Sequence, residues 1–146
     1  MIFIGALGIA VRAIAPLIRH KTVDSPVLVL DEAGQFVIPV LSGHLGGANE
    51  LAQQIAESLH SAAVVTTATD VNGLFAVDVF ARKNGLRVCN PEAIRHVSGK
   101  LLQGEIIVMA VDPACMSPEE MAELQPSKEV KLISWNEAQA EHAVAV

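Results

Sequence analysis

The stretch Leu41-Ser42-Gly43-His44-Leu45-Gly46-Gly47-Ala48-Asn49-Glu50-Leu51 joins an apolar run to a segment with helical periodicity, and it decides the predicted fold. The residues before it, Gln35 to Leu41, have the composition of a strand. After it, small and aliphatic residues recur at a spacing of three and four as far as about His60, which predicts an amphipathic helix. The glycines therefore lie where a strand passes into a helix.

Two interpretations of this loop are open. The first N–H groups of a helix have no partners within it and lie at the positive end of its dipole, so they favour an anion or a developing oxyanion. Glycine also lets a ligand approach the backbone closely, so the loop is a candidate site. In the second interpretation the glycines only permit a tight turn, and His44 packs or caps the helix. The spacing matches neither the dinucleotide fingerprint nor a phosphate loop.

The composition is that of a globular protein and excludes several functions. The chain has 146 residues, of which 51% are hydrophobic, enough for one domain with a buried core. We expect no transmembrane helix and no signal peptide, because charges interrupt the apolar runs and no basic leader precedes the first one. A net charge of −6 and 3% aromatic residues argue against nucleic acid as a partner. Cys89 and Cys115 are isolated, which indicates a reducing cytoplasm and no metal site.

The order of strand-like and helix-like segments predicts an α/β fold, a three-layer sandwich with helices on both faces of a mostly parallel sheet that includes one antiparallel hairpin. The predicted strands are Ile2–Leu7 (fully buried), Val27–Leu30, Gln35–Leu41, Ala63–Thr67, Leu86–Cys89, Glu105–Val111 and Glu129–Ser134. The predicted helices are Ile9 to about Ala15, the segment that ends near His60, Ala76–Asn84, Asn90 to about Gln103, and a short acidic helix that opens at Ser117. We expect the last residues of the segment Trp135–Val146 to be poorly ordered.

The predicted hairpin comes from Val27–Leu30 and Gln35–Leu41, which a short polar loop ending in Gly34 separates. Pro39 cannot donate to a strand ladder, so its strand lies at an edge or carries a bulge. If the strand Ala63–Thr67 is parallel to Gln35–Leu41, the polar loop that follows it emerges at the same sheet edge as the glycine loop. The two loops would then face one crevice.

Two further residues have both a functional and a structural interpretation. Asp70, in the second polar loop, is either catalytic or a cap and turn residue. Arg12, expected in the first turns of its helix, is either a binder of carboxylates or a surface charge.

Three segments in order, Gly8 to Pro16, Ser42 to Ala52 and Thr66 to Asp70, together resemble the CbiG family, the cobalt-precorrin-5A hydrolases of cobalamin biosynthesis. Asp78 and the run Asn90 to Ile94 extend the resemblance to about Val111. The resemblance implies that residues 1–89 form an α/β core similar to the family's N-terminal domain. It also implies that residues 90–146 are a segment of the family's middle region with a weakly ordered tail. The family is longer at both ends, so we expect this chain to be a fragment that does not complete the reaction alone.

The resemblance implies a hydrolase that opens the δ-lactone of a cobalt-corrinoid and releases acetaldehyde, with no cofactor of its own because the substrate carries the cobalt. Such a reaction needs a base and donors aimed at the oxyanion. We assign catalysis to His44 and Asp70: His44, kept neutral by the helix dipole, would accept a proton, and Asp70 would either orient His44 or act as the base itself. The N–H groups of Gly46 and Gly47 would hold the oxyanion. The sequence does not predict the oligomeric state. The predicted substrate-binding residues are Arg12, Ser42, Gly43, Gly46, Gly47, Asn49, Thr66, Thr67, Thr69 and Asn72. The alternatives are a non-catalytic corrinoid-binding or scaffold domain, and a phosphate- or nucleotide-binding α/β domain.

Overall fold

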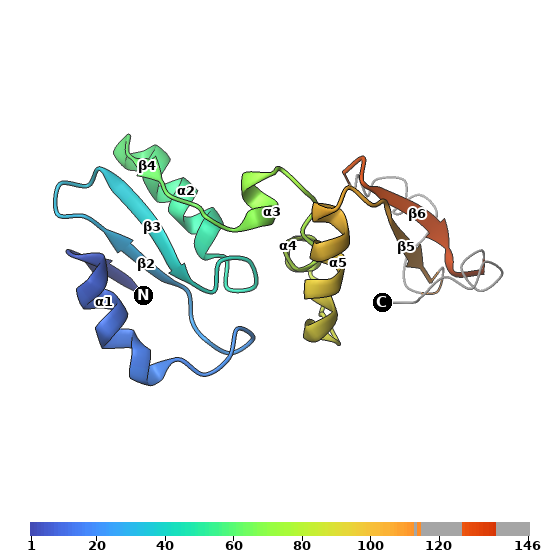
Figure 1. Ribbon diagram of the computed structural model, residues 1–146, viewed down its shortest axis with the longest axis horizontal. Helices are drawn as coiled ribbons and strands as arrows, with labels where there is room; N and C mark the ends of the chain where they lie inside the picture. Colours follow the sequence, from blue (N-terminus) through green and yellow to red (C-terminus); the bar gives the residue numbers. More distant parts are fainter. Residues whose placement is uncertain (113, 115–126, 137–146) are drawn as a thin grey trace.

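The computed structural model describes residues 1–112, 114 and 127–136. Within these ranges four strands form one sheet in the order β1-β2-β3-β4, and β5 and β6 form a second sheet (Figure 1). The predicted class is confirmed: the fold is α/β, its strand pairs are parallel except for one antiparallel pair, and helices lie beside the sheets.

The first sheet contains the predicted hairpin. Strand β2 (Val27–Leu30) is antiparallel to β3 (Phe36–Leu41), and Asp31 closes the loop between them, because its carboxylate accepts hydrogen bonds from the N–H groups of Ala33 and Phe36. The outer strands β1 (Ile2–Ile4) and β4 (Ala62–Ala63) are parallel to β2 and β3, respectively. The carboxyl ends of β3 and β4 therefore meet at one edge of the sheet, and those of β1 and β2 at the opposite edge.

The predicted irregularity at Pro39 is also confirmed. Leu28 pairs with Pro39 whereas Val27 pairs with Leu41, so the register shifts next to the glycine loop. On the other side of β3, strand β4 pairs only with Phe36 and Val37. The missing N–H of Pro39 therefore leaves no hydrogen bond to β4 unmade.

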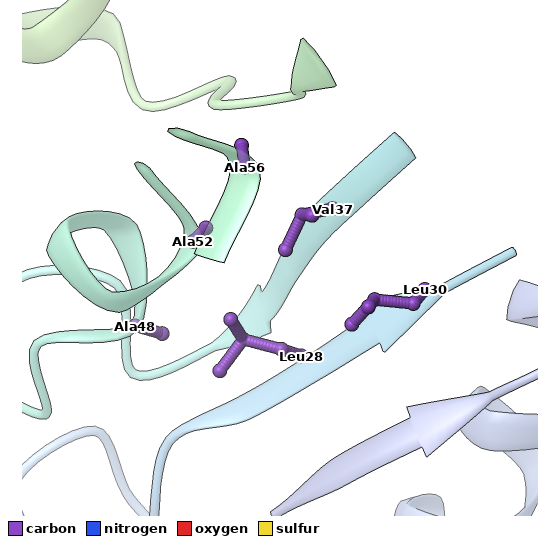
Figure 2. Packing of buried hydrophobic residues seen from close by; sticks show 6 residues of the cluster. All are labelled: Leu28, Leu30, Val37, Ala48, Ala52 and Ala56. Atoms are coloured by element: carbon purple, nitrogen blue, oxygen red, sulfur yellow. The ribbon is translucent and has the colours of Figure 1, made fainter. Parts of the chain in front are cut away.

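Helices α1 (Leu7–Ile14) and α2 (Ala48–Leu59) cover the two faces of this sheet, and the short 3₁₀ helix η1 (Ala15–Leu17) follows α1 (Figure 1). All four residues of β2 are buried, as expected for a strand covered on both sides. Figure 2 shows the core on the α2 side, where three alanines of the helix face larger strand residues. The cluster consists of Leu28, Leu30, Val37, Ala48, Ala52 and Ala56. Small helix residues let α2 approach the sheet closely, which brings the start of α2 to the sheet edge.

Three predicted strands were wrong in extent or existence. The segment Ile2–Leu7 is not fully buried: only three of its residues form β1, which is an outer strand of the sheet, and Ile4 is 76% exposed. Strand β4 is shorter than Ala63–Thr67, because after Ala63 the chain leaves the sheet and forms the short helix α3 (Ala68–Val71). The segment Leu86–Cys89 forms no strand, since no neighbouring strand is available to pair with it in the described part of the chain.

The second half of the chain has its own core. Helix α4 (Val77–Lys83) is followed by the 3₁₀ turn η2 (Pro91–Ala93) and by α5 (Ile94–Leu102). Strand β5 (Ile107–Val111) is parallel to β6 (Val130–Ser134), which confirms the two strands predicted there. The buried cluster is Phe75, Val97, Leu101 and Val130.

The acidic helix predicted from Ser117 lies outside the described residues, as does most of the segment Trp135–Val146. None of the described helices has the length and hydropathy needed to cross a lipid bilayer.

Candidate functional site

The glycine loop satisfies the start of α2 with its own carbonyl groups. The N–H groups of Ala48 and Asn49 donate to the carbonyl oxygens of Ser42 and Gly43, each at 3.1 Å, and the N–H of Gly47 donates to His44 at 3.0 Å. The predicted oxyanion donor at Gly47 is therefore wrong, because this N–H is already bound within the loop. The donor role of Gly46, which is exposed, stays a prediction.

Steric contacts explain why two of these positions are glycine. A Cβ atom at Gly46 would lie 2.5 Å from the Cβ of Ser42, and one at Gly43 would lie 2.7 Å from Oδ1 of Asn49. Ser42 has a positive φ of 57°, and its hydroxyl donates to the carbonyl of Asp24 at 2.7 Å. Both glycines thus let the loop fold tightly, which supports the structural interpretation for Gly43 and Gly46.

The two polar loops lie side by side, as predicted. Nε2 of His44 lies 2.7 Å from Oδ2 of Asp70, which belongs to α3 after β4. The side chain of Asn49 donates from Nδ2 to Oδ2 of Asp70 and to the hydroxyl of Thr67, both at 2.8 Å. The Thr67 hydroxyl in turn donates to the same carboxylate oxygen. Three donors thus converge on Oδ2 of Asp70, while its Oδ1 has no hydrogen bond within the described residues.

A second carboxylate, which the sequence reasoning did not assign to the site, faces the other side of the His44 ring. Oδ1 of Asp78, in the first turn of α4, lies 3.3 Å from Nδ1 of His44. Asp78 is only 5% exposed. The sequence contains one indication of this role, an acidic residue between the apolar Val77 and Val79. A carboxylate on a buried helix face needs a polar or cationic partner, so Asp78 was a candidate to contact the site.

These two carboxylates hold His44 in its charged form. Its pKa is raised from 6.5 to about 9; the hydrogen bond with Asp78 is the largest cause, burial of the ring opposes it, and Asp70 adds to the rise. The expectation that the helix dipole keeps His44 neutral near pH 7 is therefore wrong. Two nearby carboxylates outweigh the partial charge of a helix end whose N–H groups are already paired.

Both carboxylates remain ionised at neutral pH. Burial by itself would raise the pKa of each, but in Asp70 the hydrogen bonds from Thr67 and His44 lower it further than burial raises it. In Asp78 the hydrogen bond and positive charge of His44 have the same effect. Because each ring nitrogen faces a different carboxylate, these three side chains do not converge on one point. Among the described residues, no cluster of three or more His, Cys, Asp or Glu side chains is arranged to hold a metal ion.

The other predicted residues differ in their places. Thr69 is buried, with its hydroxyl 3.4 Å from Nε2 of His44, at the margin of the cluster. Asn72 follows the last residue of α3 and donates to the carbonyl of Ala68 in that helix, and Thr66 is exposed beside the cluster. Arg12 lies in the last turn of α1, not the first turns, and the ion pairs and hydrogen bonds of the described residues do not connect it to His44.

The cluster combines an ionised carboxylate, one oxygen of which is available, with a protonated imidazole. Such a pair can take a proton from water and stabilise negative charge on a reacting oxygen. A phosphate, by contrast, would meet two carboxylates and helix N–H groups that are already paired, so the geometry argues against a phosphate or nucleotide site.

Two family models match consecutive parts of the chain. The model described as cobalamin synthesis G N-terminal matches residues 1–70, and the one described as cobalamin biosynthesis central region matches residues 75–146. His44 and Asp70 belong to the first match and Asp78 to the second.

Curated proteins and a solved structure agree with these matches. The chain is 56% identical over 81 residues to a protein of Salmonella typhimurium named cobalt-precorrin-5A hydrolase, and 41% identical over 109 residues to a protein of Priestia megaterium with the same name. These matches cover 56% and 75% of the chain but only 23% and 29% of the two relatives. A crystal structure of a cobalamin biosynthesis protein G homologue from Sulfolobus solfataricus is similar over 91% of this chain and 39% of its own, with a TM-score of 0.51 and 25% identity.

Proposed function

Because this chain belongs to the CbiG family of cobalamin biosynthesis, we propose that it takes part in the hydrolysis of cobalt-precorrin-5A. In this proposal the δ-lactone of the corrinoid is opened by water and a two-carbon fragment leaves as acetaldehyde. The substrate carries the cobalt, so the chain itself supplies only organic acid and base groups. The relatives that bear this activity in their names are about three to four times longer than the parts matched here.

The observation that carries the proposal is the contact between His44 and Asp70 at 2.7 Å. It places a cation and an ionised carboxylate at one sheet edge, in a chain that is 56% identical over 81 residues to a named cobalt-precorrin-5A hydrolase. Hydrolysis of a lactone needs both kinds of group, a base for the attacking water and a positive charge near the developing oxyanion.

Asp70 acts as the base in this proposal. Its Oδ1 accepts a proton from water as the water oxygen bonds to the lactone carbonyl carbon. When the ring C–O bond breaks, Asp70 returns this proton to the leaving alkoxide. The acetaldehyde leaves in a second step, in which the new alcohol gives its O–H proton to Asp70, its C–C bond to the macrocycle breaks as the aldehyde carbonyl forms, and the macrocycle keeps the bonding electron pair. His44 stays protonated, keeps Asp70 ionised through the 2.7 Å contact and offsets the negative charge on the carbonyl oxygen. The base originally expected at His44 is thereby replaced by its partner.

The substrate-binding residues divide into two groups in this proposal. Ser42, Gly43, Gly47, Asn49 and Thr67 shape the site, because their polar groups or close contacts are used within the protein. The remaining candidates for contact with the corrinoid are Gly46 through its exposed backbone, Asn72 through the side-chain oxygen that it does not use within the described residues, and Thr66, Thr69 and Arg12. A corrinoid carries several carboxylates, so neutral hydroxyl and amide donors and a guanidinium suit it in a protein with a net charge of −6.

We also propose that the reaction takes place in the cytoplasm. The exposed thiol of Cys89 is free, which agrees with a reducing compartment.

The test uses a chimera, in which residues 1–111 of this chain replace the equivalent segment of the Salmonella typhimurium relative. Incubated with cobalt-precorrin-5A, the chimera should open the lactone and release acetaldehyde, seen by mass spectrometry as a corrinoid that has gained water and lost the C2H4O of acetaldehyde. A chimera that binds the corrinoid without releasing acetaldehyde would instead support a binding or scaffold domain and overturn the proposal. The unmodified relative serves as the positive control, and the isolated 146-residue chain should bind more weakly and turn over little substrate.

A further inference from the structure

The ring of His44 lies between two acceptors that come from different helices. Its Nε2 lies 2.7 Å from Asp70 of α3 and its Nδ1 lies 3.3 Å from Asp78 of α4. An ionised carboxylate only accepts hydrogen bonds, so each ring nitrogen must carry a hydrogen to make both contacts favourable. A neutral imidazole has one N–H and would turn a lone pair toward one of the carboxylates. The geometry therefore favours the doubly protonated ring.

Asp78 depends on this ring for its own place in the fold. Asp78 is 5% exposed, and Val77 and Phe80 of the same helix pack against the buried cluster of the second half of the chain. The N–H of Val79 also donates to Oδ1 of Asp78, at 3.1 Å. A buried carboxylate without a cation is strongly unfavourable, so Asp78 and His44 stabilise each other's charged forms.

Although the contact with Asp78 is longer than that with Asp70, Asp78 has the larger effect on the pKa of His44. We explain this order by burial, since the side chain of Asp70 is 32% exposed and that of Asp78 only 7%. Charges interact more strongly where water is excluded. In addition, Oδ2 of Asp70 also accepts from the side chains of Asn49 and Thr67, whereas Oδ1 of Asp78 also accepts from the backbone N–H of Val79.

A separate ion pair holds α4 against α2. Arg82, one turn after Asp78, donates to Oε2 of Glu50 at 2.5 Å, and its guanidinium lies beside Gly47. This pair involves neither nitrogen of His44. The position of α4 and the charge state of His44 can therefore be disturbed independently, through Glu50 in one case and Asp78 in the other.

We propose that Asp78 is a positioning residue, which fixes the orientation of the His44 ring toward Asp70 and keeps both ring nitrogens protonated. This inference rests on the proposed function for its role in catalysis, but the geometry it invokes is a property of the free protein. It makes the site a joint product of the region matched at residues 1–70 and the region matched at 75–146. The charged groups that face the ring are Asp70 and Asp78; Thr69 beside it is neutral, and Glu50 on α2 is paired with Arg82.

The experiment is a titration of the 146-residue chain by NMR of its imidazole groups, with the signal of His44 assigned by its loss in His44→Gln. In the unaltered chain, His44 should keep two nitrogen-bound protons at neutral pH and titrate near pH 9. Asp78→Asn should lower this midpoint by about one pH unit or more, and by more than Asp70→Asn does. Glu50→Gln is the matched control, since it breaks the other contact between α2 and α4, and it should leave the midpoint unchanged.

Two results would overturn the inference. One is a His44 that titrates near its ordinary value in the unaltered chain, a result that does not depend on whether any variant folds. The other is a midpoint that falls equally in Asp78→Asn and Glu50→Gln, which would make Asp78 only a docking contact of α4. Since no substrate is used, failure here is separate from failure of the proposed reaction.

Discussion

His44 and Asp70 are 26 residues apart in the sequence, yet Nε2 of one lies 2.7 Å from Oδ2 of the other, because the parallel strands β3 and β4 end at the same edge of the sheet. The glycine loop after β3 carries the histidine, and α3 after β4 carries the aspartate. The contact thus depends on sheet topology, and the chemistry of the two side chains depends on the charges around them.

The first prediction concerns stability against pH. Because the pKa of His44 is higher in the folded chain than the ordinary value of 6.5, its stabilising effect is complete below about pH 6.5 and is lost as pH rises through about 9. The linked loss in free energy of unfolding is at most on the order of 3 kcal/mol. Urea unfolding of the unaltered chain and of His44→Gln, at several pH values across this range, measures it. If the difference between the two proteins does not shrink toward alkaline pH, the charged state assigned to His44 is incorrect.

The second prediction uses two glycines in opposite settings. Gly46→Ala places a Cβ 2.5 Å from the Cβ of Ser42 and 2.8 Å from its carbonyl oxygen, so the loop must shift, at a cost of about 1 to 3 kcal/mol. Gly99→Ala lies within α5, where nothing approaches within 4 Å, and should stabilise the chain by about 0.5 to 1 kcal/mol. Thermal unfolding of both variants should shift the midpoint in opposite directions. A Gly46→Ala chain as stable as the unaltered one would remove the steric role given to this glycine.

The third prediction tests the amide of Asn49. Asn49→Asp replaces a donor to Asp70 by a carboxylate of like charge in a position that is 7% exposed, and should cost about 2 to 4 kcal/mol near neutral pH. The cost should fall in acid, where the new carboxylate takes up a proton. Gln53→Glu makes the same change of charge on the exposed face of the same helix and should be nearly neutral. Equal losses in the two variants would indicate a general effect of charge.

The fourth prediction compares neighbouring threonines. Thr67→Val removes a hydroxyl that donates to Asp70 and accepts from Asn49, and should destabilise the chain by about 1 to 2 kcal/mol. Thr66→Val changes an exposed side chain and should leave stability within about 0.5 kcal/mol. An effect of Thr66→Val confined to the Kd for cobalt-precorrin-5A would support its assignment to substrate binding, whereas a stability loss equal to that of Thr67→Val would contradict the described network.

The sequence was sufficient to predict those parts of the fold that local patterns specify. The polar loop at Asp31 predicted the hairpin, Pro39 predicted the irregular register, and the Asn90-Pro91-Glu92 start predicted the helix that follows. Local patterns did not predict how far a strand extends, because extension depends on a neighbour. Ile2 to Ile4 is apolar on both faces yet lies at the sheet edge, and Leu86 to Cys89 has strand composition but no partner in the described chain.

The site was predictable in its location but not in its electrostatics. Two polar loops after parallel strands were enough to place His44 beside Asp70. The approach of Asp78 comes from the way α4 docks on the glycine loop, and no spacing in the sequence encodes that contact. Without it, the sequence indicated the helix dipole as the main influence on the charge of His44, and the predicted charge was wrong. The sequence also did not predict that the carbonyl groups of Ser42 and Gly43 accept hydrogen bonds from the first N–H groups of α2, because these bonds depend on the backbone geometry of the loop.

The catalytic role of His44 and Asp70 is tested most directly by the rate at which the chimera with the Salmonella typhimurium relative releases acetaldehyde from cobalt-precorrin-5A. This rate is compared with the rates of the Asp70→Asn and His44→Gln variants of the chimera and with that of the Glu50→Gln control. We predict that each of the two site variants lowers kcat by roughly a hundredfold or more while the control keeps a rate close to that of the unaltered chimera. Unchanged rates in both Asp70→Asn and His44→Gln would contradict the assignment of this cluster as the catalytic centre.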